Sequence, residues 1–129
     1  MVGRMMFDTN VVIGMLRQDH SVQELFSQVD EILLSNVVLG ELYFGARKSA
    51  RVEENLNRIN RLAGDFTITI SDTITSQVIG EIKSQLQAKG RMIPENDIWI
   101  AASAIQHGLA LATRDKHFNE VEGLTLVTL

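Results

Sequence analysis

Residues 4–16 read RMMFDTNVVIGML, an apolar run followed by three polar residues and a second apolar run. The first run, Met5-Met6-Phe7, is typical of a short strand that is buried on both faces. The polar triplet Asp8-Thr9-Asn10 favours the start of a helix, and the apolar pattern predicts that this helix continues to Leu16. A buried strand that leads directly into a helix is the repeating unit of parallel α/β proteins.

The rest of the chain repeats this alternation of helices and short apolar strands. Ser21, Ser71 and Pro94 mark predicted helix starts, and β-rich apolar segments mark the strands. The predicted strands cover residues 31–35, 66–70, 109–113 and 124–127, and the predicted helices cover 21–29, 36–48, 51–62, 71–90 and 94–108, with a turn or short helix at 115–118. We therefore expect an α/β fold, a three-layer α/β/α sandwich with a mostly parallel central sheet, in which residues 1–129 form a single domain.

The composition excludes several classes of protein. No cysteine occurs among the 129 residues, which excludes disulfides, thiolate zinc sites and a cysteine nucleophile. No apolar run approaches the roughly 18 residues of a membrane span, and Asp8 comes too early for a signal peptide, so we expect a cytoplasmic protein that does not use a membrane. The 12 basic and 16 acidic residues give a net charge of −4, which by itself does not favour nucleic-acid binding.

Three aspartates lie at positions where a parallel sheet binds its ligands. Asp8 and Asp115 each follow a predicted strand, and Asp97 lies in the first turn of a predicted helix, on the side that faces the core. Each has an ordinary structural explanation, as a helix N-cap, a turn residue and a partner of the helix dipole, respectively. Parallel sheets bind ligands beyond the carboxyl ends of their strands, so the same positions also predict a shared site.

Glu41 is harder to explain as a structural residue. Its neighbours one helical turn away are Val37, Val38, Phe44 and Gly45, none of which can pair with a carboxylate. Burying an unpaired carboxylate is costly, so Glu41 either reaches solvent at the edge of the sheet or meets a cation.

The four carboxylates together predict a metal site. Asp8, Glu41, Asp97 and Asp115 would repel one another in one cleft, and Mg²⁺ or Mn²⁺ would relieve that repulsion by binding their oxygens. Removing these four from the 16 acidic residues leaves 12, equal to the 12 basic residues, so the net acidity of the chain is assigned to the site. A cation beside a phosphodiester can activate water, orient the phosphate and neutralise the leaving oxygen, which leaves a 5′-phosphate and a 3′-hydroxyl.

Four parts of the chain, taken in order, resemble the PIN-domain ribonucleases. They are residues 7–10 (FDTN), Glu41 in its apolar helix, residues 94–102 (PENDIWIAA) and residues 112–118 (ATRDKHF). More narrowly, the chain resembles the VapC toxins of bacterial toxin–antitoxin pairs. The resemblance implies a Mg²⁺- or Mn²⁺-dependent endoribonuclease that cuts structured RNA such as tRNA or ribosomal RNA, a cognate antitoxin that blocks the cleft, and a homodimer.

The same resemblance assigns roles to individual residues. It implies that the catalytic and metal-binding residues are Asp8, Glu41, Asp97 and Asp115. Thr113 matches a small hydroxyl residue of the family, and we expect Thr113 and Asn10 to support the acids or to contact substrate. His117 stands where members vary and often carry an acid, so its contact with the metal is left open.

A cluster of basic residues has two interpretations. Arg47, Lys48 and Arg51 belong to a group of five basic residues within fifteen positions, completed by Arg58 and Arg61. The group is either a solvated helix face or a contact for RNA phosphates or for an acidic antitoxin segment.

Other functional classes fit less well. The three histidines are scattered and lack visible general-base partners, which argues against a histidine-pair ribonuclease. A receiver-type phosphoacceptor domain requires a second acid beside Asp8 and a lysine at the end of a late strand, and Asn10 and Lys116 do not meet these requirements. A catalytically silent PIN-like binding module would not need all four acids. Metal-dependent cleavage of RNA separates the nuclease from these last two classes.

Overall fold

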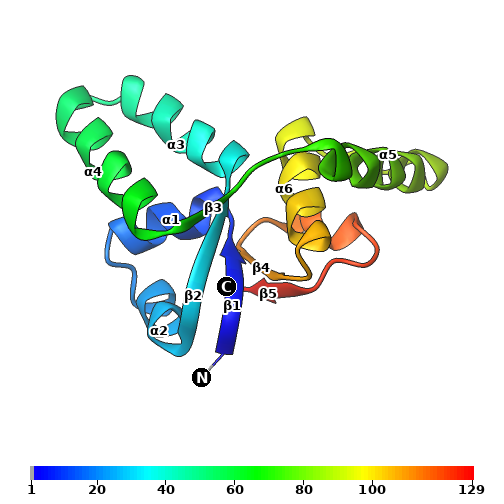
Figure 1. Cartoon of the computed structure of the whole chain (residues 1–129), viewed down its shortest axis with the longest axis horizontal. Helices are drawn as coiled ribbons and strands as arrows, with labels where there is room; N and C mark the ends of the chain where they lie inside the picture. Colours follow the sequence, from blue (N-terminus) through cyan, green and yellow to red (C-terminus); the bar gives the residue numbers. More distant parts are fainter. Residues whose placement is uncertain (1) are drawn as a thin grey trace.

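The computed structural model describes residues 2–129 and shows helices alternating with short strands (Figure 1). The strands of this part of the chain are β1 (Val2–Phe7), β2 (Val29–Ser35), β3 (Thr67–Thr69), β4 (Ala110–Thr113) and β5 (Leu126–Thr128). Its α-helices are α1 (Thr9–Leu16), α2 (His20–Gln28), α3 (Asn36–Arg47), α4 (Val52–Asp65), α5 (Thr73–Ala88) and α6 (Glu95–Gln106), and a 3₁₀-helix, η1 (Lys116–Glu120), precedes β5.

The strands form one sheet in the order β3-β2-β1-β4-β5, and every neighbouring pair is parallel. β1 lies at the centre, where Met6 pairs with Leu33 of β2 and Leu111 of β4, and all three side chains are at most 1% exposed. The predicted fold class is confirmed, because continuous apolar runs suit strands that are covered on both faces.

Helices cover both faces of the sheet. Figure 1 shows α1, α2, α3 and α4 on one side of the strands and α5 and α6 on the other. Val11 and Val12 of α1 and Ile98 and Ile100 of α6 are fully buried in the core. None of the helices in residues 2–129 combines the length and apolar composition that a bilayer crossing requires.

Two helix caps differ from the prediction. Asp19, rather than Ser21, caps α2, since its Oδ1 accepts both the backbone N–H of Ser21 (3.1 Å) and the Ser21 hydroxyl (2.8 Å). Asp72, rather than Ser71, caps α5 by accepting the backbone N–H of Thr75 (3.0 Å), while the Thr75 hydroxyl accepts the N–H of Asp72 (2.9 Å). In both cases the helix begins directly after the aspartate, so the carboxylate, and not the serine hydroxyl, reaches the free N–H groups of the first turn.

Several element boundaries also differ by a few residues. β2 begins at Val29, two residues earlier than predicted, because Val29 pairs with Val2 at the start of β1. α4 continues to Asp65, and its last turn is closed by the N–H of Phe66, which donates to the carbonyl of Leu62 (3.0 Å). The strand predicted over 66–70 is shorter, and the last strand begins two residues later than predicted.

The topology places β1 and β4 side by side at the point where the strand order reverses. In the sheet, β2 and β3 lie on one side of β1, and β4 and β5 lie on the other. In open parallel sheets this switch point opens the crevice that binds ligands, beyond the carboxyl ends of the strands. Asp8 follows β1 directly, and Asp115 lies two residues after β4.

Candidate active site

Asp8 follows β1 directly, caps the N-terminus of α1 and is buried. It is 4% exposed, and its Oδ1 accepts the backbone N–H of Thr9 (2.8 Å) at the start of α1. Its own N–H donates to the carbonyl of Ala112 (2.9 Å), which ties the end of β1 to β4. The predicted cap is therefore present, but a cap alone does not require a buried carboxylate.

Thr113 connects the two acids that follow the strands. Its hydroxyl donates to Oδ2 of Asp8 (2.7 Å) and accepts the backbone N–H of Asp115 (2.9 Å), and the side chain is 1% exposed. The next residue, Arg114, donates its N–H to Oδ1 of Asn10 (3.2 Å). Thr113 and Asn10 thus position the turn that carries Asp115.

Glu41 reaches the same region from α3. Its Oε1 accepts the hydroxyl of Thr9 (2.6 Å), the residue that also donates its backbone N–H to Asp8. The side chain is half-buried, and Phe44, one turn further along, is 63% exposed. The helix face around Glu41 is therefore open to solvent, which is one of the two solutions expected for this carboxylate.

Asp97, Asp115 and His117 form the tightest acidic group. The side chain of Asp97, in the first turn of α6, is only 14% exposed, and that of Asp115, the N-cap of η1, is 32% exposed. His117 Nδ1 lies 3.0 Å from Oδ1 of Asp115 and 3.3 Å from Oδ2 of Asp97. Each of these three side chains offers one potential metal-ligand atom, and the three atoms lie within 4.8 Å of one another.

The pKa values of the acids reflect burial and mutual repulsion. Burial raises the pKa of Asp8 above its ordinary value against the hydrogen bonds from Thr113 and Thr9, and the charges of Glu41 and Asp115 raise it further. Burial raises the pKa of Asp97 to about 6, reinforced by the charges of Asp8 and Asp115, while His117 opposes the rise. All four predicted acids therefore belong to one electrostatically coupled region.

The residues of this region fit a divalent cation. In the described part of the chain, neither a lysine nor an arginine forms an ion pair with any of the four acids. Carboxylate oxygens whose charges repel one another are the donor set that a hard divalent cation uses. The contact of His117 with the metal site, left open by the family resemblance, depends on η1, which directs the side chain toward Asp97 and Asp115.

The predicted basic contacts lie at the end of α3 and just before α4. Arg47 and Lys48 end α3, Arg51 precedes α4, and all three are exposed. Lys48 Nζ lies 4.4 Å from the centre of the Phe44 ring, and Arg51 pairs with Glu54 at 3.4 Å. These three residues, hereafter the basic strip, lie on the surface where α3 ends and α4 begins.

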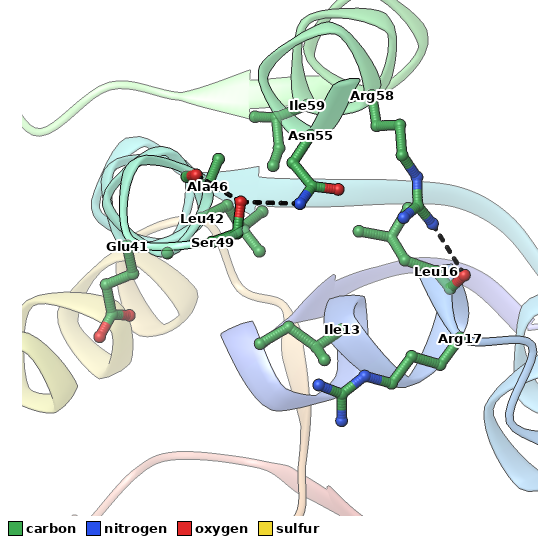
Figure 2. Close-up of a pocket in the computed structure, with 11 residues that line it drawn as sticks. Ile13, Leu16, Arg17, Glu41, Leu42, Ala46, Ser49, Asn55, Arg58 and Ile59 are labelled. Carbon is green, nitrogen blue, oxygen red and sulfur yellow. Dashed lines mark hydrogen bonds between the residues drawn. The ribbon is translucent and has the colours of Figure 1, made fainter. Parts of the chain in front are cut away.

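A groove between α1, α3 and α4 leads to Glu41, with a cavity volume of about 290 Å³. Figure 2 shows apolar side chains lining it, with Glu41 at one side and Arg17 and Arg58 at the other. The Arg58 guanidinium donates to the carbonyl of Leu16 (3.0 Å), and the Asn55 amide donates to the hydroxyl of Ser49 (2.9 Å). Because Glu41 lines the groove and also contacts Thr9, the groove adjoins the acidic region.

Comparison with known proteins identifies the family. Residues 5–124 match the family described as the PIN domain. The chain belongs to the PIN-domain family. This confirms the resemblance found in the four sequence segments, and it agrees with an acidic crevice at the carboxyl edge of a parallel sheet.

This PIN domain is similar over most of its length to ribonucleases named VapC. It is 34% identical to ribonuclease VapC2 of Haemophilus influenzae over 122 residues, which are 92% of each chain. It is 32% identical to the tRNA(fMet)-specific endonuclease VapC of Shigella flexneri, over 94% of each chain. Among solved structures, VapBC2 of Rickettsia felis, bound to a DNA fragment from its promoter, aligns with a TM-score of 0.89 at 26% identity, covering 98% of each chain.

Proposed function

We propose that this PIN domain is the endoribonuclease toxin of a toxin–antitoxin pair, and that residues 1–129 act as one nuclease domain. The observation that carries the proposal is the coupled acidic region at the carboxyl ends of β1 and β4, where the pKa of Asp97 is raised to about 6. The similarity to VapC ribonucleases supports RNA as the substrate, with structured RNA such as tRNA or ribosomal RNA the first candidates. The similarity to a VapBC complex supports an antitoxin partner.

We assign Asp8, Glu41, Asp97 and Asp115 to the binding of Mg²⁺, with Mn²⁺ as a substitute. When bound, the cation would supply a Lewis acid that lowers the pKa of water and neutralises charge on the phosphate. Asp8 and Asp115 are held in place by Thr113, and Glu41 by Thr9, so the carboxylates keep their positions without a substrate. Such preorganisation reduces the reorganisation required during the reaction.

Purified protein incubated with total tRNA tests this function directly. We expect discrete cleavage products from the wild-type chain and intact RNA after addition of its cognate antitoxin. A receiver domain or a silent binding module would leave the RNA intact in both samples. The resemblance also implies a cytoplasmic homodimer, and light scattering of the purified chain measures the oligomeric state.

The basic strip is the candidate contact for RNA phosphates. Replacing Arg47, Lys48 and Arg51 by alanine in the inactive Asp8→Asn background should weaken RNA binding and flatten its dependence on salt. Each lost phosphate contact lowers the slope of log K against log salt by roughly 0.7 for single-stranded RNA, so three contacts lower it by about 2.

The control removes three positive charges elsewhere, by alanine replacement of Lys83, Lys89 and Arg91 on and after α5. If both triple variants show the same slope, the strip is a solvated face and this assignment is wrong.

The groove between α1, α3 and α4 is the candidate surface for the antitoxin. Its wall consists largely of apolar side chains such as Ile13, Leu42 and Ile59, which suit an amphipathic helix of a partner. A helix seated here would lie against Glu41, and a cationic residue at its end would meet the uncompensated acids. Occupation of the groove would therefore cover the acidic region and exclude RNA.

Two glycines of α3 provide a matched test of this surface. Gly45 lines the groove and Gly40 does not, and a Cβ added at either position meets no atom within 4 Å. Gly45→Trp should weaken antitoxin binding by about a hundredfold, because a ring that fills the groove excludes the partner's apolar side chains. Gly40→Trp should bind like the wild type in calorimetric titrations. Equal affinities for the two variants would place the antitoxin elsewhere.

A further inference from the structure

His117 lies against the acidic region, at the position whose metal contact the family resemblance leaves open. The backbone N–H of His117 donates to Oδ1 of Asp115 (2.9 Å), and the buried Phe118 anchors η1 in the core. This short helix directs His117 Nδ1 to within 3.0 Å of Oδ1 of Asp115 and 3.3 Å of Oδ2 of Asp97. The His117 side chain is 54% exposed.

We propose that His117 is a nitrogen ligand of the divalent cation, beside Asp97 and Asp115, and that it shifts the preference of the site from Mg²⁺ toward transition-metal ions. The proposal rests on the proposed metal-dependent function and names a further ligand for it. Adjacent ligands of an octahedral ion with bonds of about 2.1 Å lie about 3.0 Å apart. The separations of His117 Nδ1 from the two carboxylate oxygens are close to this spacing.

The chemical consequence of an imidazole ligand is a change in selectivity. Mg²⁺ prefers oxygen ligands, whereas imidazole nitrogen suits first-row transition metals. A site with carboxylates alone would hold both kinds of ion through charge. Adding His117 gives transition-metal ions an interaction that Mg²⁺ does not share to the same degree.

A different role for His117 would leave a different signature. A protonated imidazole that only offsets the charges of Asp97 and Asp115 would compete with every cation. Its removal would then strengthen the binding of Mg²⁺ and Mn²⁺ alike. Removal of a ligand instead weakens Mn²⁺ binding more than Mg²⁺ binding, so the ratio of the two affinities separates the two roles.

Pulsed electron paramagnetic resonance on the RNA-free protein loaded with Mn²⁺ tests direct coordination. We expect coupling between Mn²⁺ and a nitrogen nucleus in the wild type and its loss in His117→Ala. His20→Ala and His107→Ala are matched controls, because they remove the other two histidines, both exposed, and should keep the coupling.

Titration of the same proteins with Mn²⁺ and Mg²⁺ supplies the second measurement. His117→Ala should lower the ratio of Mn²⁺ to Mg²⁺ affinity by on the order of tenfold. His117→Asp should restore Mg²⁺ binding without restoring the nitrogen coupling, because it returns an oxygen ligand to the same position.

The outcomes separate this inference from the proposed function. Mn²⁺ that binds the carboxylates without nitrogen coupling, or an unchanged affinity ratio in His117→Ala, would overturn the role of His117 and leave the metal site standing. Failure of the wild-type protein to bind Mn²⁺ at all would overturn both. Nitrogen coupling that is lost only in His117→Ala supports the inference.

Discussion

Replacement of Asp8 by asparagine should abolish RNA cleavage and, in chelator, raise the melting temperature of the protein. Asparagine is as good an N-cap as aspartate, so the start of α1 is preserved. The substitution removes the negative charge of Asp8, a residue that is only 4% exposed. The charges of Glu41 and Asp115 lie close to it and repel it. We expect a gain on the order of 1 kcal/mol in the free energy of unfolding, or roughly 2–6 °C for a chain of this size.

The gain in stability should depend on pH in a defined direction. The pKa of Asp8 is raised in the folded protein, so the folded state binds this proton more tightly than the unfolded state does. The ionised carboxylate therefore destabilises the fold above its raised pKa, and the penalty vanishes below the ordinary value of 3.8, where both states are protonated. The advantage of Asp8→Asn should be full above the raised pKa of Asp8, and should fade as the pH falls through that pKa toward 3.8.

Millimolar Mg²⁺ should reduce or reverse this difference. The wild type gains the free energy of metal binding, which the variant cannot match. The measurement is thermal melting of both proteins in chelator and in Mg²⁺, beside a cleavage assay in which the variant loses more than about a hundredfold in rate. Asp30→Asn removes an exposed charge from the start of β2 and should change none of these values. If the Asp8→Asn protein melts like the wild type in both buffers and still cuts RNA, Asp8 acts only as a helix cap.

The fold could be predicted from local patterns because its strands are short, apolar and separated by capped helices. Met5-Met6-Phe7 and Leu109–Thr113 are recognisable as buried strands, and their parallel pairing follows from the helices between them. The errors occurred where two capping residues stand close together. A sequence pattern does not decide between Asp72 and Ser71, because the choice depends on which side chain reaches the N–H of Thr75.

The candidate site could be predicted only in part. Asp8 and Asp115 follow from their positions after strands, and Glu41 follows from the lack of a partner on its helix. The hydroxyls that hold these acids could not be predicted in detail, since the contact of Thr9 with Glu41 joins residues 32 positions apart. The sequence predicts a turn or short helix at 115–118, but the direction of the His117 side chain depends on the 3₁₀ geometry of η1, which that prediction does not specify.

The second large effect is expected from removal of the metal. Cleavage should vanish in chelator and return with Mg²⁺ or Mn²⁺, whereas Ca²⁺ should bind but support little cleavage because its coordination is looser. Metal at a free concentration of about 100 times its Kd should stabilise the fold by about 2.7 kcal/mol. Asp8→Asn, which lacks a proposed ligand, should show a much smaller rise in melting temperature. An equal rise in the melting temperature of both proteins would show that the metal binds at another site.

The chemical ends of the RNA fragments test the central claim most directly. Hydrolysis by water at the acidic region predicts a 5′-phosphate and a 3′-hydroxyl on every product. These ends are read by enzymatic labelling of fragments made by the wild type in Mn²⁺, with the Asp8→Asn protein and a chelator-treated sample as controls for contaminating nuclease. Products with exclusively these ends, formed only by wild-type protein with metal, are the predicted result. Fragments with a 2′,3′-cyclic phosphate and a 5′-hydroxyl, or cleavage that persists in chelator, would contradict the account.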